Sequence, residues 1–416
     1  MFVRLLSSSM KIKKLFYLLP IVLLSYLASC TSQTESAQDV TDSVDTVKMD
    51  SIKADTVEMV IVPEIEKDTV LDNIARFVAG LPQLSENTFS KLESDKYWID
   101  FKTSMDASWD KMYSSRLSKM EKWEAEHLSQ SKNDSLTLFY PFSGPDFLHA
   151  HYLFPQTNEF VMAALEPIKE IVPLDTVSVE DRDKFLDSLG ISLRDIFQKS
   201  YFITTHMQAD LKQIKGVLPP LYFFLERSGH EILTQKFITL DTAGNELELE
   251  ARKLHWNKIP GVKLTFRVRD TDVVKTLYYF SISISNGGLK ERPEFVKFIS
   301  KRAPFNTFVK SASYLMHRDA FTSIRDLIIQ NSQALFQDDT GIPYRHFKKR
   351  LDWMGTFYGE YTKPVKDFEE ALFQKDLDSA YKASPKNTLP FSLGYHWGSS
   401  KQNYMLFRRA SVASTK

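Results

Sequence analysis

The sequence has one cysteine, few glycines and no net charge, and these shortages argue against several kinds of protein. Its 416 residues include one Cys, 14 Gly, and 53 basic against 53 acidic side chains. A single cysteine forms no internal disulfide, and balanced charge gives no electrostatic argument for a nucleic-acid partner. The motifs GxSxG, GxGxxG, GxxxxGK, HExxH and CxxC are also missing. We therefore expect no cofactor and no nucleic acid, and the sequence leaves open whether the protein is an enzyme.

Residues 1–29 are predicted to be a signal peptide that is absent from the mature chain. Four basic residues and no acidic residue precede Cys30, and a mostly apolar run, LFYLLPIVLLSYLA, extends from Leu15 to Ala28. That run is short for a transmembrane helix and contains Pro20, so it fits the apolar region of a signal peptide better. We therefore leave these residues out of the predicted fold.

The segment LASC, which ends at Cys30, resembles the lipobox of bacterial lipoproteins. The resemblance implies that Cys30 is lipidated and holds the protein to a lipid bilayer by several acyl chains, since one chain anchors only weakly. Thr31 follows the cysteine, where an Asp marks retention at the inner membrane in some lipoproteins, and no acidic cluster follows immediately. The resemblance thus implies the outer membrane, facing the periplasm. A cleaved secretory signal with an incidental cysteine is the alternative.

Residues 30–70 are predicted to form a flexible acidic tether. The stretch from Thr31 to Val70 contains ten acidic residues, three lysines and no aromatic residue, so its net charge is −7. Such a segment buries too little apolar surface to fold alone. The signal peptide contributes +4, which leaves about +3 for residues 71–416. These residues are predicted to form the globular body, with a possible subdivision near residue 233.

The spacing of apolar residues in the body predicts a mixture of helices and strands. Helices are expected within 71–128, 178–229, 294–330 and 363–383, with Gly190 as a helix stop. Strands are expected at 136–142, 160–165, 245–250, 262–268, 280–284 and 353–361, with a closing hairpin of 389–397 and 403–409. The strands at 262–268 and 280–284 alternate apolar and polar residues, which is typical of antiparallel neighbours. We predict an α+β fold with helical segments packed on antiparallel sheet or sheets, without βαβ alternation.

The stretch YPFSGPDFLHAHYLFP, residues 140–155, is the first candidate for a site. Pro145 suits the first position of a helix and Asp146 suits its first turn. The amide groups at a helix start can meet an anion, so Ser143, Gly144 and Asp146 are candidate ligand-binding residues. The alternative is a helix N-terminus whose polar groups are satisfied locally.

The same stretch supplies candidate catalytic residues, Asp146, His149 and His151. On a helix, Asp146 and His149 share one side, whereas His151 points elsewhere. The three residues therefore do not form a complete metal site, which usually needs three or four ligands. Such a site would need His206 or His230 in addition, and no residue is assigned to a metal. His230 is also a candidate general base.

Two further motifs give weak signals. Asp339 begins an Asp-Thr-Gly sequence like that of aspartic proteases, but the chemistry needs two carboxylates, and the only echo, at Asp241, lacks the glycine. A turn is the simpler interpretation. Tyr395, His396 and Trp397 could line a sugar- or peptide-binding face, although packing is the commoner reason for such residues.

The phrases YPFSGPDFLHA, LEP at 165–167, FVKSASYLMH and DDTGIPYRHF are similar to those of a group of bacterial exported proteins and lipoproteins with no established activity. The resemblance implies an exported lipoprotein with one integrated body, and it implies no reaction. We therefore expect a binding or structural protein of the cell envelope, with an envelope protein or a small ligand as partner. The alternative is an envelope hydrolase, with or without the assistance of a metal, with its site around Asp146, His149 and His151.

Overall fold

The computed structural model describes residues 65–128, 136–202, 214, 216–254, 258–365, 368, 372–398 and 401–410. Its α-helices are α1 (Thr69–Val78), α2 (Lys96–Met112), α3 (Ser118–His127), α4 (Phe147–Leu153), α5 (Val179–Lys199), α7 (Leu218–Arg227), α8 (Asn286–Glu291), α9 (Pro293–Ser300), α10 (Thr322–Asn331) and α11 (Lys375–Ala383). Its strands are β1 (Leu138–Pro141), β2 (Glu159–Ala164), β3 (His230–Leu240), β4 (Glu246–Leu249), β5 (Gly261–Val268), β6 (Val274–Ser281), β7 (Phe305–Val309), β8 (Ser332–Gln337), β9 (Trp353–Gly359) and β10 (Asn403–Arg409).

The strands of the described residues form one sheet in the order β4-β3-β5-β6-β2-β1-β7-β8-β10-β9. The five central strands, β6, β2, β1, β7 and β8, are parallel. On both sides the outer strands pair antiparallel. Numbered along the chain, the parallel strands have the order 3-2-1-4-5, which is that of a doubly wound sheet. The chain therefore changes direction across the sheet between β1 and β7.

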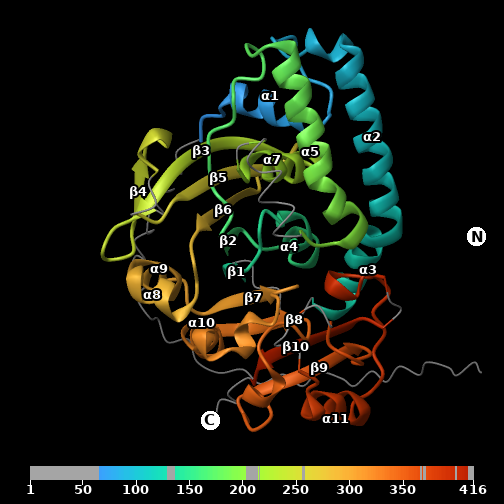
Figure 1. Ribbon diagram of the computed structural model, residues 1–416, viewed down its shortest axis with the longest axis vertical. Coiled ribbons are helices and arrows are strands. Elements are labelled where there is room, and N and C mark those ends of the chain that lie inside the picture. Colours follow the sequence, from blue (N-terminus) through green and yellow to red (C-terminus); the bar gives the residue numbers. More distant parts are fainter. Residues whose placement is uncertain are drawn as a thin grey trace, which may run out of the picture. The chain divides into compact units, whose positions relative to one another are not determined.

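Helices cover both faces of this sheet (Figure 1). One hydrophobic core lies between the sheet and helices α1 to α5 and α7, and the other lies between the sheet and α8 to α11. Along β1, Leu138 and Tyr140 belong to the first core and Phe139 to the second. Both faces of the central strands are buried, so these strands are largely apolar and show no alternation, although β7 includes the buried polar residues Asn306 and Thr307.

The α+β class is confirmed, because helices pack on a ten-stranded mixed sheet in the described part of the chain. The expectation of antiparallel pairing holds for β5 and β6 but is wrong for the centre, where βαβ units join β1 to β2 and β7 to β8. The predicted helical region 294–330 also contains β7. The closing hairpin is wrong as well, since β10 pairs with β8 and β9 rather than with residues 389–397.

Helix α5 shows how a helix start can be predicted more safely than its end. Ser178 caps the helix as expected, because its Oγ accepts a hydrogen bond from the Asp181 amide at 3.1 Å. Gly190 does not stop the helix, which continues to Lys199 and ends at Ser200 with a left-handed backbone, φ 68°. A glycine inside a helix is unfavourable but tolerated where the helix packs well.

Residues 63–416 form one compact unit, and the sheet passes through residue 233 within β3. Among the residues that the structure describes, no helix combines the length and the apolar character needed to span a bilayer. The predicted signal peptide, Cys30 and most of the tether lie outside the described residues.

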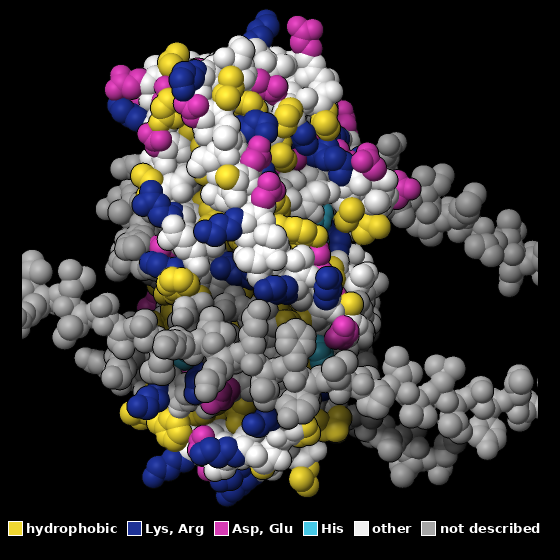
Figure 2. Space-filling model, turned by 90° about the vertical axis from the view of Figure 1, so that its right-hand side faces the viewer, with side chains coloured by type: hydrophobic (Ala, Val, Ile, Leu, Met, Phe, Trp, Pro, Cys, Tyr) yellow, Lys and Arg dark blue, Asp and Glu magenta, His cyan; other side chains and the backbone are white. Residues whose placement is uncertain are grey.

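The surface over α2 and α3 carries charge unevenly (Figure 2). Acidic side chains lie mostly toward the upper end of this face, whereas Lys and Arg predominate around its middle. Hydrophobic side chains are scattered between them, which is normal for a folded protein.

Candidate functional site

The candidate site is a pocket at the carboxyl ends of β1, β2, β6 and β7. Its cavity volume is about 160 Å³, and the pocket is open at its edge, where Leu165 is 68% exposed. The pocket lies where the strand order reverses, between β1 and β7. In open α/β sheets this switch point is the usual place for a ligand. The fold therefore places the pocket where a ligand site is expected.

The turn after β1 forms one wall of the pocket. Phe142 and Gly144 both have left-handed backbones, with φ of 60° and 52°. Pro145 follows, and Asp146 caps α4 by accepting a hydrogen bond from the His149 amide at 3.3 Å. The predicted ligand residues Ser143, Gly144 and Asp146 all line the pocket. The turn is thus where the sequence predicts it, but the helix begins later than expected, because Pro145 precedes it and Asp146 is its N-cap rather than a residue of its first turn.

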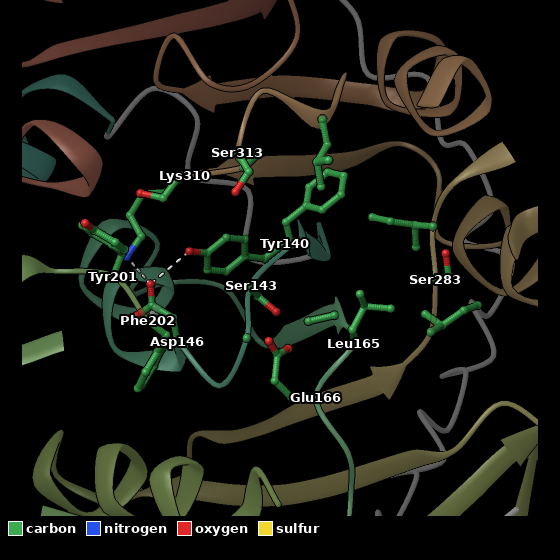
Figure 3. Close-up of a pocket in the computed structure, with 18 of the residues that line it drawn as sticks. Tyr140, Ser143, Asp146, Leu165, Glu166, Tyr201, Phe202, Ser283, Lys310 and Ser313 are labelled. Carbon is green, nitrogen blue, oxygen red and sulfur yellow. Dashed lines mark hydrogen bonds and ion pairs between the residues drawn. The ribbon is translucent and has the colours of Figure 1, made fainter. Parts of the chain in front are cut away.

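Asp146 forms a buried ion pair with Lys310, which follows β7 directly (Figure 3). Its Oδ2 also accepts a hydrogen bond from Tyr140 at 3.0 Å, and its Oδ1 lies 2.8 Å from Nδ1 of His149. Lys310 donates a further hydrogen bond to the carbonyl of Ser200. Burial alone raises the pKa of Asp146, but His149 and Lys310 outweigh it and lower this pKa to about 2. Asp146 therefore stays ionised and is fully engaged within the protein.

The candidate histidines do not converge on one site. His149 is fully buried, and burial lowers its pKa to about 4, so it is neutral at pH 7. His151 instead packs edge-on against His230, with ring centroids 4.6 Å apart. His206 lies outside the described residues. Among the residues that are described, no three His, Cys, Asp or Glu side chains are grouped as metal ligands would be.

A second carboxylate in the pocket lining is that of Glu166, near Ser143 (Figure 3). Glu166 follows β2, and Tyr279 donates a hydrogen bond to its Oε2 at 3.4 Å and to its carbonyl oxygen at 3.2 Å. Burial raises the pKa of Glu166, although Tyr279 and backbone amides oppose this. Leu165 beside it is 68% exposed at the pocket edge. This part of the pocket pairs a weakly engaged carboxylate with exposed apolar surface.

The segment after β7 completes the pocket with hydroxyl groups. Ser311 and Ser313 both have left-handed backbones, with φ of 53° and 52°. Ser313 and Tyr395 share a hydrogen bond of 2.8 Å between their hydroxyl oxygens. The Oγ atoms of Ser143 and Ser311 are buried without a hydrogen-bond partner among the described residues. Backbone strain and unsatisfied buried polar groups are both typical of functional sites.

The Asp-Thr-Gly motif lies behind the pocket, at the end of β8. The Gly341 amide bonds to the Asp338 carbonyl at 3.2 Å, which makes the predicted turn. The Asp339 carboxylate accepts hydrogen bonds from Tyr314 at 2.8 Å and Asn403 at 3.0 Å. Asp241, the possible partner carboxylate, instead organises the exposed turn between β3 and β4. The two carboxylates of an aspartic protease are therefore not brought together.

Sequence reasoning missed several pocket residues, notably Glu166, Lys310 and Ser311. One signal could have found Glu166: a strand, a Ser-Gly-Pro turn, a helix and a second strand that ends at an acid, 22 residues after Gly144. That is about the spacing at which an acidic residue meets a ribose in doubly wound folds. The β1–α4–β2 unit lacks the glycine fingerprint and β1 is short, so the sequence pattern did not indicate it.

Comparison with protein-family models, with curated proteins and with solved structures gives no match for this chain. The functional interpretation therefore depends on the geometry of the pocket.

Proposed function

We propose that the protein is a lipoprotein of the bacterial cell envelope, held to the outer membrane by Cys30 and facing the periplasm, whose body binds a nucleoside-type small molecule in the switch-point pocket. The LASC sequence and the acidic tether support the first part. The observation that carries the second part is the position of Glu166, directly after the second parallel strand and in the wall of the pocket.

Glu166 supports a ligand with vicinal hydroxyl groups. A carboxylate at this position in doubly wound folds accepts hydrogen bonds from a ribose. Hydrogen bonds to a charged group contribute about 1.5–3 kcal/mol each, more than those between neutral groups. The unpaired Oγ of Ser143 points toward the same part of the pocket (Figure 3). A sugar ring could therefore satisfy both side chains.

The apolar surface beside Glu166 supports a flat heterocycle as the second part of the ligand. Leu165, Ile282 and Ile284 line this side of the pocket, and Phe142 and Phe321 lie at a ring-centroid distance of 5.8 Å from one another. Small-molecule sites commonly combine such apolar walls with a few polar groups that fix orientation. A nucleoside has this combination of a flat base and a hydroxylated sugar.

Isothermal titration calorimetry of the detergent-solubilised full-length protein with adenosine, guanosine, cytidine and uridine tests the ligand. We expect at least one nucleoside to bind and to raise the apparent stability, by about 2.7 kcal/mol at a hundredfold excess over Kd. Glu166→Gln should weaken binding about tenfold or more. Glu170→Gln, an exposed carboxylate four residues further along, is the matched control and should bind normally. Failure of all four nucleosides to bind contradicts the proposal.

The anchor has a separate test. Cys30→Ser removes the thiol that the lipidation needs, so the protein should move from the membrane fraction to the soluble fraction. Continued membrane association of this variant contradicts lipidation at Cys30.

The alternative of a metal-assisted hydrolase gains no support from a specific observation. Asp146 is occupied by Tyr140, His149 and Lys310, and His151 faces another part of the core. We therefore do not propose it as a second function.

A further inference from the structure

We infer that the ligand is a nucleoside without phosphate groups, neutral or positively charged at the end that faces the β1–α4 turn. This inference rests on the proposed function and names the class of ligand that the same pocket accepts. Three observations carry it: the start of α4, the charges that line the pocket and the partners of Lys310.

The start of α4 is closed to a phosphate. Phosphates bind helix starts through free backbone amides and the positive end of the helix dipole. Here Pro145 has no N–H, the Phe147 amide bonds to the Pro145 carbonyl at 2.9 Å, and the His149 amide bonds to Asp146. The ionised Asp146 carboxylate already occupies the favourable position for an anion. A phosphate at this point would meet the negative charge of Asp146.

The charged side chains that line the described pocket are Asp146, Glu166 and Lys310. Asp146 and Lys310 neutralise one another at contact distance. The carboxylate of Glu166 is left without a cation in the lining, so the walls carry a net negative charge when Glu166 is ionised. A phosphate monoester or diphosphate adds further negative charge, and like charges repel one another.

Lys310 is not available to bind a phosphate. Its ammonium group donates to Asp146 and to the Ser200 carbonyl, and it lies 3.1 Å from Nδ1 of His149. Behind the lining, the buried Arg116 donates to the Ile196 carbonyl at 3.1 Å, and Asp338 accepts the Ser311 amide at 2.9 Å. These two groups have opposite charge, so together they add no net positive charge behind the described lining. An uncharged hydroxymethyl group or an amine fits this end of the pocket better.

A charge series of ligands tests the inference. Calorimetry compares adenosine, 5′-amino-5′-deoxyadenosine, AMP and ADP on the full-length protein at low salt. Adenosine and the amine should bind most tightly, and ADP should bind least tightly. AMP should bind at least about tenfold more weakly than adenosine, which corresponds to about 1.4 kcal/mol. The disadvantage of AMP should shrink at high salt, because salt screens the repulsion at an open pocket. If another base is preferred, the same series is built on that base.

A matched variant distinguishes charge from shape. Ser283 is exposed and lines the pocket, so Ser283→Lys adds a cation without disturbing a buried contact. The ratio of the Kd for AMP to the Kd for adenosine should move toward unity in Ser283→Lys and stay unchanged in Ser283→Gln. AMP or ADP that binds as tightly as adenosine overturns the inference and leaves the proposed function intact. Absence of binding by every nucleoside and nucleotide overturns both.

Discussion

Two carboxylates line the pocket, and they have different surroundings. Asp146 lies on the β1–α4 side, where Tyr140, His149 and Lys310 engage both of its oxygens. Glu166 lies at the end of β2, where Tyr279 donates a hydrogen bond to its carboxylate at 3.4 Å and backbone amides also contribute. The first has its pKa lowered to about 2 and the second has its pKa raised. Burial disfavours the charge of both, and the difference comes from their partners.

The comparison indicates different roles for the two carboxylates. The buried carboxylate of Asp146 stabilises the fold, because through Lys310 it connects α4 with β7 and with the end of α5. The described side-chain partner of the Glu166 carboxylate is Tyr279 alone, and a ligand that supplies donors can add hydrogen bonds to it. We therefore infer that the Asp146 carboxylate is structural and that the Glu166 carboxylate is the one that contacts the ligand.

The largest expected effect comes from Asp146→Ala. This substitution leaves Lys310 as an unpaired buried charge, so the free energy of unfolding should fall by about 3–5 kcal/mol. Glu166→Ala should change it by less than about 1 kcal/mol, because the removed carboxylate is poorly paired. Urea denaturation followed by circular dichroism measures both.

A second substitution identifies the cause of that loss. Lys310→Met in the Asp146→Ala background removes the unpaired charge and should recover part of the stability. Equal losses for Asp146→Ala and Glu166→Ala contradict the assignment of roles to the two carboxylates.

A smaller effect concerns acid stability on the Asp146 side, where α4 packs on His230. The pKa of His230 is lowered to about 4 by burial and by nearby cations, against about 6.5 in the unfolded chain. Because the pKa is lowered in the folded state, neutral His230 contributes to the free energy of unfolding, and this contribution is complete above pH 6.5. It is lost as pH falls from 6.5 toward 4, by about 1.4 kcal/mol per pH unit. Asp146 remains ionised throughout this range.

Unfolding experiments between pH 7 and 4 check this expectation. Between pH 7 and pH 4 the free energy of unfolding should fall less in His230→Phe than in the wild type. At pH 4 the difference between the two losses should be about 3 kcal/mol. His127→Phe, in which a side chain about a third exposed is replaced, is the control and should follow the wild type. An unchanged slope for His230→Phe shows that His230 is not a source of acid sensitivity.

The smallest expected effect comes from Ser143→Ala. The Ser143 hydroxyl has no partner among the described residues, so its removal should leave stability unchanged within about 0.5 kcal/mol. Loss of one neutral hydrogen bond should weaken nucleoside binding by about two- to tenfold, measured by calorimetry. Unchanged binding indicates that Ser143 does not contact the ligand.

The sequence predicts a strand well when one of its faces is buried and the other is more exposed. Strand β5 alternates apolar and polar residues since one of its faces is more exposed, and its antiparallel pairing with β6 is confirmed. Strands β1 and β7 are buried on both faces, so neither alternation nor length distinguishes them from core helix segments. The parallel order of the centre therefore could not be read from periodicity.

The candidate site was predicted in part for a related reason. Asp146 and His149 are brought together because residues three apart on a helix share one side, and this follows from local geometry. Lys310 reaches Asp146 from a position 164 residues away, and Glu166 meets the pocket through the pairing of β1 with β2. Such contacts depend on the topology of the sheet, which local spacing does not specify.

The most direct test of the central claim compares adenosine with 2′-deoxyadenosine, or the corresponding pair of whichever nucleoside binds, by calorimetry on the wild type and on Glu166→Gln. If the Glu166 carboxylate accepts the ribose hydroxyls, the wild type should bind the deoxy form about ten- to a hundredfold more weakly. Glu166→Gln should discriminate far less between the two. Equal affinity of the wild type for both nucleosides would contradict the assignment of Glu166 as the residue that recognises the ligand.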